Sequence, residues 1–320
     1  MLDRDVEITR ADAPLRGTLA MPSRGEAQAV ILMIHGSGPL DRNENMSGQA
    51  LDIFNALAAE LARGGYASLR YDKRGCGLSG GDYYTSGHGD FLADAAAWVE
   101  YLEANQTLIS RHIYILGHSV GTLIAAQLAA EKRIAGLILL CPFIRGIEAI
   151  LRKQAAIVEH EMRQISGLRG VYYRLTMGIF GGPVGSQEKL ITRLKTTREP
   201  SLRHGLSGRI DARCLREEMA IAPAEVYAAV KVPALVFAGA NDVQCDPADA
   251  AAIGAILGEA AEVHVEPGLS HILRKEERPG GFLGYAQQLR RPMDDAVAAR
   301  ILLWLRTRMS LQGPARGPGL

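Results

Sequence analysis

The sequence predicts an α/β protein built on a doubly wound, mainly parallel sheet with a helical insertion. Short, continuous apolar runs rich in Val, Ile and Leu recur along the chain, and such runs are typical of strands buried on both faces of a parallel sheet. Helical patterns lie between these runs, which gives the alternating β-α order of a doubly wound sheet. This alternation is interrupted once, between residues 144 and 230, where no convincing buried strand occurs.

The individual elements follow from these patterns in chain order. Two short alternating segments, residues 5–9 and 15–20, predict an antiparallel hairpin at the sheet edge. Buried strands are then expected at residues 29–34, 67–71, 113–116, 136–141, 234–238 and 263–265. Helices of the core are expected at residues 51–63, 90–103, 122–131, 249–257 and 294–308.

The interruption predicts a cap. Its helical patterns fall at residues 147–166, 187–197 and 215–221, with a Gly-rich stretch at 178–185. An insertion at this point lies over the carboxyl edge of the sheet, where such folds bind ligands. We therefore expect an α/β core at 1–143 and 231–309, a helical cap at 144–230, and a disordered tail at 310–320, which is rich in Gly and Pro.

The bulk composition excludes several classes of function. The chain has 320 residues, 48% of them apolar and 22% charged, which describes a globular protein. Its 36 basic and 35 acidic residues give a formal charge of +1, so no long-range field favours nucleic acid or an anionic membrane. The four cysteines form no Cys-x-x-Cys pair, which predicts reduced thiols rather than a zinc site or a disulfide framework.

The N-terminal residues alternate charged and apolar side chains, unlike the unbroken apolar stretch of a signal peptide. No window approaches the ~18 uninterrupted apolar residues that a membrane span requires. A cytoplasmic protein with no membrane partner is expected.

Ser119 is the candidate nucleophile. It lies in Gly-His-Ser-Val-Gly at residues 117–121, directly after an apolar run and directly before a helical pattern. A serine at the tip of a tight strand-to-helix turn is held in a strained conformation, and the flanking glycines let strand and helix approach each other. The turn exposes the hydroxyl above the carboxyl edge of the sheet, as nucleophilic catalysis requires.

A serine needs a base and an orienting acid, each on a loop that follows a strand. Asp242 follows the run 234–238 and is the candidate acid, with Asp246 and Asp249 as alternatives; Asp249 resembles the N-cap of the next helix. Of the eight histidines, His271 alone lies in a loop after the last predicted strand, so it is the candidate general base. His118 lies inside the strand-to-helix turn of Ser119, here called the elbow, and is expected to form hydrogen bonds with the backbone.

The oxyanion formed in acyl transfer needs two backbone donors. Val120, at the start of the helix after Ser119, supplies one candidate amide. The loop after residues 29–34 begins His-Gly-Ser-Gly-Pro, whose glycines allow close approach of the backbone to a substrate. The amide of Ser37 is therefore the second candidate.

In these motifs the chain resembles the α/β-hydrolase superfamily. The likeness rests on His35 and Gly36 at the strand end, residues 71–79 (Tyr-Asp-Lys-Arg-Gly-Cys-Gly-Leu-Ser), the elbow, and the loops of Asp242 and His271. Residues 36–44, Gly-Ser-Gly-Pro-Leu-Asp-Arg-Asn-Glu, resemble a bacterial branch of intracellular carboxylesterases with a helical cap. The resemblance implies a triad at Ser119, Asp242 and His271 and hydrolysis of a small ester.

Two weaker motifs carry no function. Residues 75–80 match Gly-x-Gly-x-x-Gly, but no helical pattern starts before Asp90, so a nucleotide is not expected. The segment from Asp41 begins like a calcium loop, but Met46 occupies the position that needs glycine. The predicted chemistry needs neither a cofactor nor a metal.

The resulting hypothesis is a serine hydrolase that cleaves a small carboxylic ester through an acyl-enzyme on Ser119. The same residues would serve a thioesterase, lactonase, amidase or acyltransferase. An alternative of another class is a non-catalytic protein that binds a small ligand. The sequence does not name the substrate, the acyl-chain preference or the oligomeric state.

Overall fold

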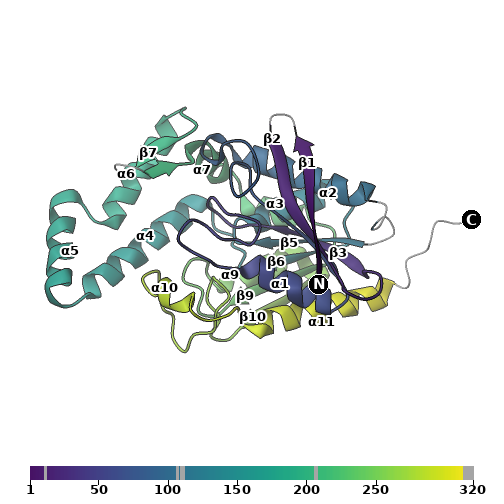
Figure 1. Ribbon diagram of the computed structural model, residues 1–320. Helices are drawn as coiled ribbons and strands as arrows, with labels where there is room; N and C mark the ends of the chain where they lie inside the picture. The colour runs from purple at the N-terminus through teal and green to yellow at the C-terminus, as the bar shows by residue number, and fades with distance from the viewer. Residues whose placement is uncertain (11–12, 106–107, 109–111, 205–207, 313–320) are drawn as a thin grey trace, which may run out of the picture.

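A computed structural model describes residues 1–10, 13–105, 108, 112–204 and 208–312. Its centre is an eight-stranded sheet in the order β1-β2-β4-β3-β5-β6-β9-β10 (Figure 1). The strands are β1 (Leu2–Arg10), β2 (Ala13–Met21), β3 (Ala29–Ile34), β4 (Ala67–Tyr71), β5 (His112–His118), β6 (Gly136–Leu140), β9 (Ala234–Gly239) and β10 (Ala261–Glu266). β1 and β2 form an antiparallel hairpin, β2 is antiparallel to β4, and every other neighbouring pair is parallel. The predicted fold class is confirmed.

Burial explains why the apolar runs become strands. Every residue of β3, β4, β6 and β9 is buried, as expected of strands covered on both faces. The edge strand β10 alternates partly buried with exposed residues over most of its length. The continuous runs therefore mark the middle of the sheet, whose carboxyl ends carry the site.

Helices cover both faces of the sheet. The core helices are α1 (Ile53–Arg63), α2 (His88–Ala104), α3 (Gly121–Glu131), α8 (Pro223–Ala228), α9 (Ala248–Leu257) and α11 (Asp295–Gln312). Apolar residues of α1 and α11 pack in one cluster on one face, around Phe54 and Trp304. Residues of α2, α3, α8 and α9 pack in a second cluster on the other face, around Trp98.

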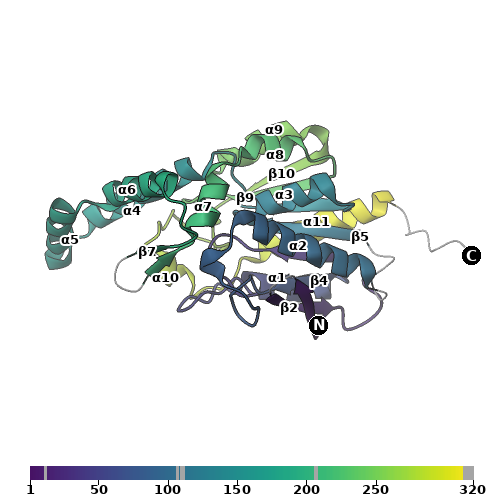
Figure 2. The same ribbon diagram turned by 90° about the horizontal axis from the view of Figure 1, so that it is seen from above.

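The insertion between β6 and β9 extends away from the sheet in both views (Figures 1 and 2). It contains α4 (Ile147–Gln164), α5 (Gly167–Phe180), α6 (Pro183–Thr196), β7 (Leu202–His204), β8 (Gly208–Ile210) and α7 (Ala212–Met219). β7 and β8 pair as an antiparallel hairpin, so the segment is not wholly helical. α8 packs on α3 and α9 of the core, although it falls within the range predicted for the cap.

α5 was not among the predicted helices, and its sequence shows why. It contains Gly167, Gly170 and Gly178, and glycine is among the residues least favourable to a helix. The Gly-rich stretch at 178–185 contains the end of α5 and the start of α6, where Pro183 occupies the first turn.

The end of the chain also differs from expectation. Residues 310–312, assigned to a disordered tail, are the last turn of α11, and residues 313–320 lie outside the described residues. A short helix, α10 (Tyr285–Gln288), precedes α11 and lies beside the site. Each helix in the described part of the chain is too short or too polar to cross a bilayer. All four cysteines are free and buried.

Candidate active site

Ser119 lies in a tight turn between β5 and α3. Its φ of 53° is in the left-handed region, which is uncommon for a residue with a side chain. A Cβ at Gly117 would lie 2.4 Å from the carbonyl oxygen of Gly121, and a Cβ at Gly121 would lie 2.3 Å from that of Ile34. Both glycines are therefore needed for the close approach of strand and helix that holds Ser119 in place.

Replacing Gly121 tests this packing. A Gly121→Ala protein is expected to lose at least about 3 kcal/mol of unfolding free energy, because its new methyl group meets rigid backbone on β3. Urea denaturation followed by circular dichroism measures this change. Gly146→Ala is the control, since a Cβ at Gly146 meets nothing within 4 Å. Equal stability of the two variants would contradict the account of the turn.

The structure brings Asp242 and His271 together. Asp242 follows β9 and His271 follows β10, and Nδ1 of the imidazole lies 2.8 Å from Oδ2 of the carboxylate. The other carboxylate oxygen, Oδ1, accepts from the backbone N–H groups of Gln244 at 2.8 Å and Cys245 at 2.9 Å. Both side chains are buried. This arrangement fixes the ring and leaves Nε2 as the nitrogen available for proton transfer.

The two alternative acids have other partners. Asp246 pairs with Arg145 at 2.9 Å and accepts from the N–H of Ala248 at the start of α9. Asp249 accepts from the N–H of Ile144 at 3.3 Å. Asp249 lies in the first turn of α9, whose N-cap is Pro247, so it is not the N-cap expected from the sequence; Asp242 is the member of the three that contacts His271.

The candidate oxyanion loop lies beside the nucleophile. A Cβ at Gly36 would lie 3.1 Å from the Cβ of Ser119. Ser37 and Val120 line one cavity together with Ser119 and His271. Among the described residues, neither the N–H of Ser37 nor that of Val120 donates to a protein acceptor. Both amides are available to a ligand oxygen, as the sequence predicts for an oxyanion site.

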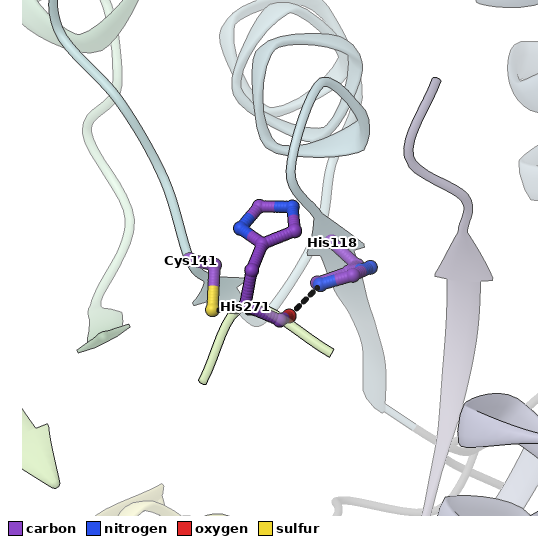
Figure 3. A group of neighbouring side chains, drawn as sticks. All are labelled: His118, Cys141 and His271. Carbon is purple, nitrogen blue, oxygen red and sulfur yellow. Dashed lines mark hydrogen bonds between the residues drawn. The ribbon is translucent and has the colours of Figure 1, made fainter. Parts of the chain in front are cut away.

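His118 links the oxyanion loop to the loop of His271. Its Nε2 donates to the main-chain oxygen of His271 at 3.0 Å, and Figure 3 shows this contact on one side of His271 with Cys141 on the other. Its Nδ1 lies 2.9 Å from Oε2 of Glu44, a fully buried carboxylate. Because both ring nitrogens face acceptors, this arrangement favours the doubly protonated imidazolium form of His118.

The opposite charges of His118 and Glu44 stabilise each other. Burial acts against both ions, but their mutual attraction and hydrogen bonds raise the pKa of His118 and lower that of Glu44. His118 thus bonds backbone as expected, and its contact with Glu44 is an addition that sequence reasoning missed. Glu44 was visible only as the last residue of the segment 36–44, because its partner is distant in sequence.

Two groups of buried side chains could also hold a metal ion. Potential ligand atoms lie within 4.8 Å of one another in His118, Cys141 and His271, and likewise in Asp242, Cys245 and His271. In both groups His271 is shared, and its Nδ1 already faces Asp242. We therefore interpret these clusters as parts of one acid–base arrangement.

The cavity beside Ser119 has a volume of about 260 Å³. Its apolar wall is formed largely by cap residues and the end of β6: Phe143, Ile147, Ile150, Leu151 and Leu215. Polar side chains also line it, among them Gln244 and Tyr285, which are joined by a hydrogen bond of 2.9 Å. Sequence reasoning placed the pocket under the cap but identified none of these lining residues, because the packing of the cap selects them.

Comparison with known proteins relates this chain to hydrolases. A family model described as serine aminopeptidase, S33, matches residues 25–278. The esterase EstD of Thermotoga maritima is 27% identical over 140 residues, covering 44% of this chain and 33% of that protein. The matched region thus spans only a third of the length of this curated relative.

Solved structures share the fold. Est1E of Butyrivibrio proteoclasticus with bound ferulic acid has a TM-score of 0.63 at 19% identity, covering 95% of this chain and 99% of that one. The Pyrococcus furiosus esterase Pf2001 has a TM-score of 0.60 at 18% identity, covering 96% and 91%. A monoglyceride lipase from Saccharomyces cerevisiae has a TM-score of 0.61 at 17% identity, covering 96% of each chain.

Proposed function

We propose that this chain, which belongs to the serine aminopeptidase (S33) family of α/β hydrolases, hydrolyses a small carboxylic ester through an acyl-enzyme on Ser119. The contact of 2.8 Å between His271 Nδ1 and Asp242 Oδ2 carries the proposal. It orients the imidazole in the cavity that Ser119 lines, and it supplies the carboxylate that a catalytic histidine requires.

The reaction proceeds in two steps, acylation and deacylation of Ser119. His271 Nε2 takes the proton of Ser119 Oγ as the oxygen attacks the ester carbonyl, and the amides of Ser37 and Val120 hold the resulting oxyanion. The C–O bond to the alcohol then breaks, and the alcohol leaves with the proton from His271. Water repeats the sequence on the acyl-enzyme and releases the acid, which restores Ser119.

The cavity favours a neutral, apolar acyl group of modest size. Its apolar wall excludes water from such a group, and its volume of about 260 Å³ is at the small end of ligand pockets. The curated relative is an esterase, which favours oxygen esters over the thioester, lactone and amide alternatives. A non-catalytic binding protein would not require Asp242 to orient His271 beside a strained serine.

An ester panel tests the substrate class. We expect the purified protein to hydrolyse p-nitrophenyl acetate and butyrate, with kcat/KM at least about tenfold lower for the palmitate ester, because a pocket discriminates by the methylenes that it accommodates. Amino acid p-nitroanilides are the matched amide substrates. Faster cleavage of the anilides would favour an aminopeptidase, and failure to cleave any ester would contradict the proposal.

A further inference from the structure

The two peptide groups on either side of the Gly36 Cα are held by two buried charged side chains of opposite sign. Glu44 Oε1 accepts the N–H of Gly36 at 2.8 Å. Lys73 Nζ donates to the carbonyl oxygen of Gly36 at 2.5 Å and to that of Gly38 at 3.0 Å. Glu44 is fully buried and Lys73 is only 8% exposed. The two carbonyls that Lys73 binds flank the amide of Ser37.

These contacts determine the direction of the Ser37 amide. In a trans peptide the carbonyl of one residue and the N–H of the next point to opposite sides of the chain. With the Gly36 carbonyl bound to Lys73, the N–H of Ser37 must point away from Lys73. Ser37 and Ser119 line the same cavity, so this amide is free to face a substrate oxygen there.

The loop needs such a restraint because glycines flank Ser37. Gly38 has a φ of 101°, and glycine crosses between backbone conformations at little steric cost. Rotation of the peptide between Gly36 and Ser37 would replace a donor at the oxyanion position with a carbonyl oxygen. A preorganised donor contributes most to catalysis, so a fixed peptide is more effective than a mobile one.

Lys73 occupies a site that supports a buried cation. Its Nζ lies 5.7 Å from the ring centroid of Tyr83 and 5.4 Å from that of Phe91, within cation–π distance. Burial lowers the pKa of Lys73, and neighbouring thiols and carboxylates oppose that change. Lys73 also lines a second cavity of about 190 Å³, which shares Gly36, Ser37 and Val120 with the first.

We propose that Lys73 is a positioning residue, which fixes the Gly36–Ser37 peptide so that the Ser37 amide faces the developing oxyanion. The inference rests on the proposed function. Lys73 acts through the backbone and does not touch the reacting atoms.

The test is a Lys73→Met protein, which keeps an unbranched side chain against Tyr83 and Phe91 and removes the donor. Its kcat for p-nitrophenyl acetate is expected to fall about 10²-fold, the effect of losing one oxyanion donor, while KM changes less than about threefold. Lys231→Met is the matched control, because Lys231 is exposed and donates to the carbonyl of Ala228 on the surface. Circular dichroism and the melting temperature report whether each variant is folded.

A second variant separates positioning from general structural damage. Lys73→Ala leaves space beside the second cavity, and an excess of propylammonium chloride is expected to restore part of kcat, whereas propionitrile, a neutral molecule of similar size without a hydrogen-bond donor, is not. Rescue by the cation alone identifies the missing donor as the cause. A folded Lys73→Met protein with wild-type kcat, or equal effects of propylammonium and propionitrile, would overturn the inference.

The remaining outcomes are also decisive. If neither Lys73 variant folds, Lys73 is a stability residue and the positioning role is overturned. If the wild-type protein cleaves no ester, the proposed function fails. If the wild-type protein cleaves esters and a folded Lys73→Met protein does so equally well, only the role of Lys73 fails.

Discussion

A Ser119→Ala protein is expected to lose ester hydrolysis, with kcat about 10⁶-fold lower, which is typical for removal of a triad serine. The variant keeps the oxyanion donors and the cavity, so substrate binding changes little while the acyl-enzyme cannot form. Alanine also fits the space of serine, and the melting temperature is expected to stay within a few degrees of the wild-type value.

The measurement is the rate of p-nitrophenol release, with Ser310→Ala as the control on an exposed face of α11. Retention of even a hundredth of the wild-type rate by a pure Ser119→Ala protein would show that another group is the nucleophile. A loss of activity accompanied by unfolding is distinguished by circular dichroism.

An Asp242→Asn protein is expected to keep its fold and lose about 10⁴-fold in kcat. The asparagine oxygen can still accept from the amides of Gln244 and Cys245. Its NH₂ group then faces His271 Nδ1, which must become an acceptor, so the ring carries its proton on Nε2. That nitrogen can no longer take the proton of Ser119.

Asp246→Asn is the matched control, because Asp246 is the neighbouring carboxylate on the same loop and pairs with Arg145 instead of His271. Its kcat is expected to stay within about threefold of the wild-type value, since removal of an exposed ion pair has a small effect. The reverse result, with Asp246→Asn inactive and Asp242→Asn active, would move the acid to Asp246.

The core of the fold could be predicted because its strands are unambiguous. Residues 29–34 and 67–71 coincide with β3 and β4, since an apolar run buried on both faces has few other interpretations. Ser119, Asp242 and His271 could be proposed from the sequence because each lies in a turn or loop that follows a strand of a parallel sheet. The carboxyl ends of parallel strands lie at one edge of the sheet, so the topology brings the loops that follow them together there.

What could not be predicted depends on contacts between distant segments. Lys73 binds the backbone carbonyl of Gly36 and Glu44 binds its N–H, but neither side chain lies in a pattern that indicates this. Helix α5 is missing from the prediction because its glycines disfavour a helix, and contacts with α4 hold it in place. Several of the residues that line the cavity come from α4, α7 and α10, whose packing against the core is not encoded by local periodicity.

The central claim is that Ser119 is an activated nucleophile. Labelling with a fluorophosphonate probe, followed by intact mass and peptide mapping, tests it most directly, because only a serine with a functioning base and oxyanion site reacts. We expect one probe per chain, attached to the peptide that contains Ser119, and no labelling of the Ser119→Ala protein. Absence of labelling in the folded wild-type protein, or undiminished labelling of the variant, would contradict it.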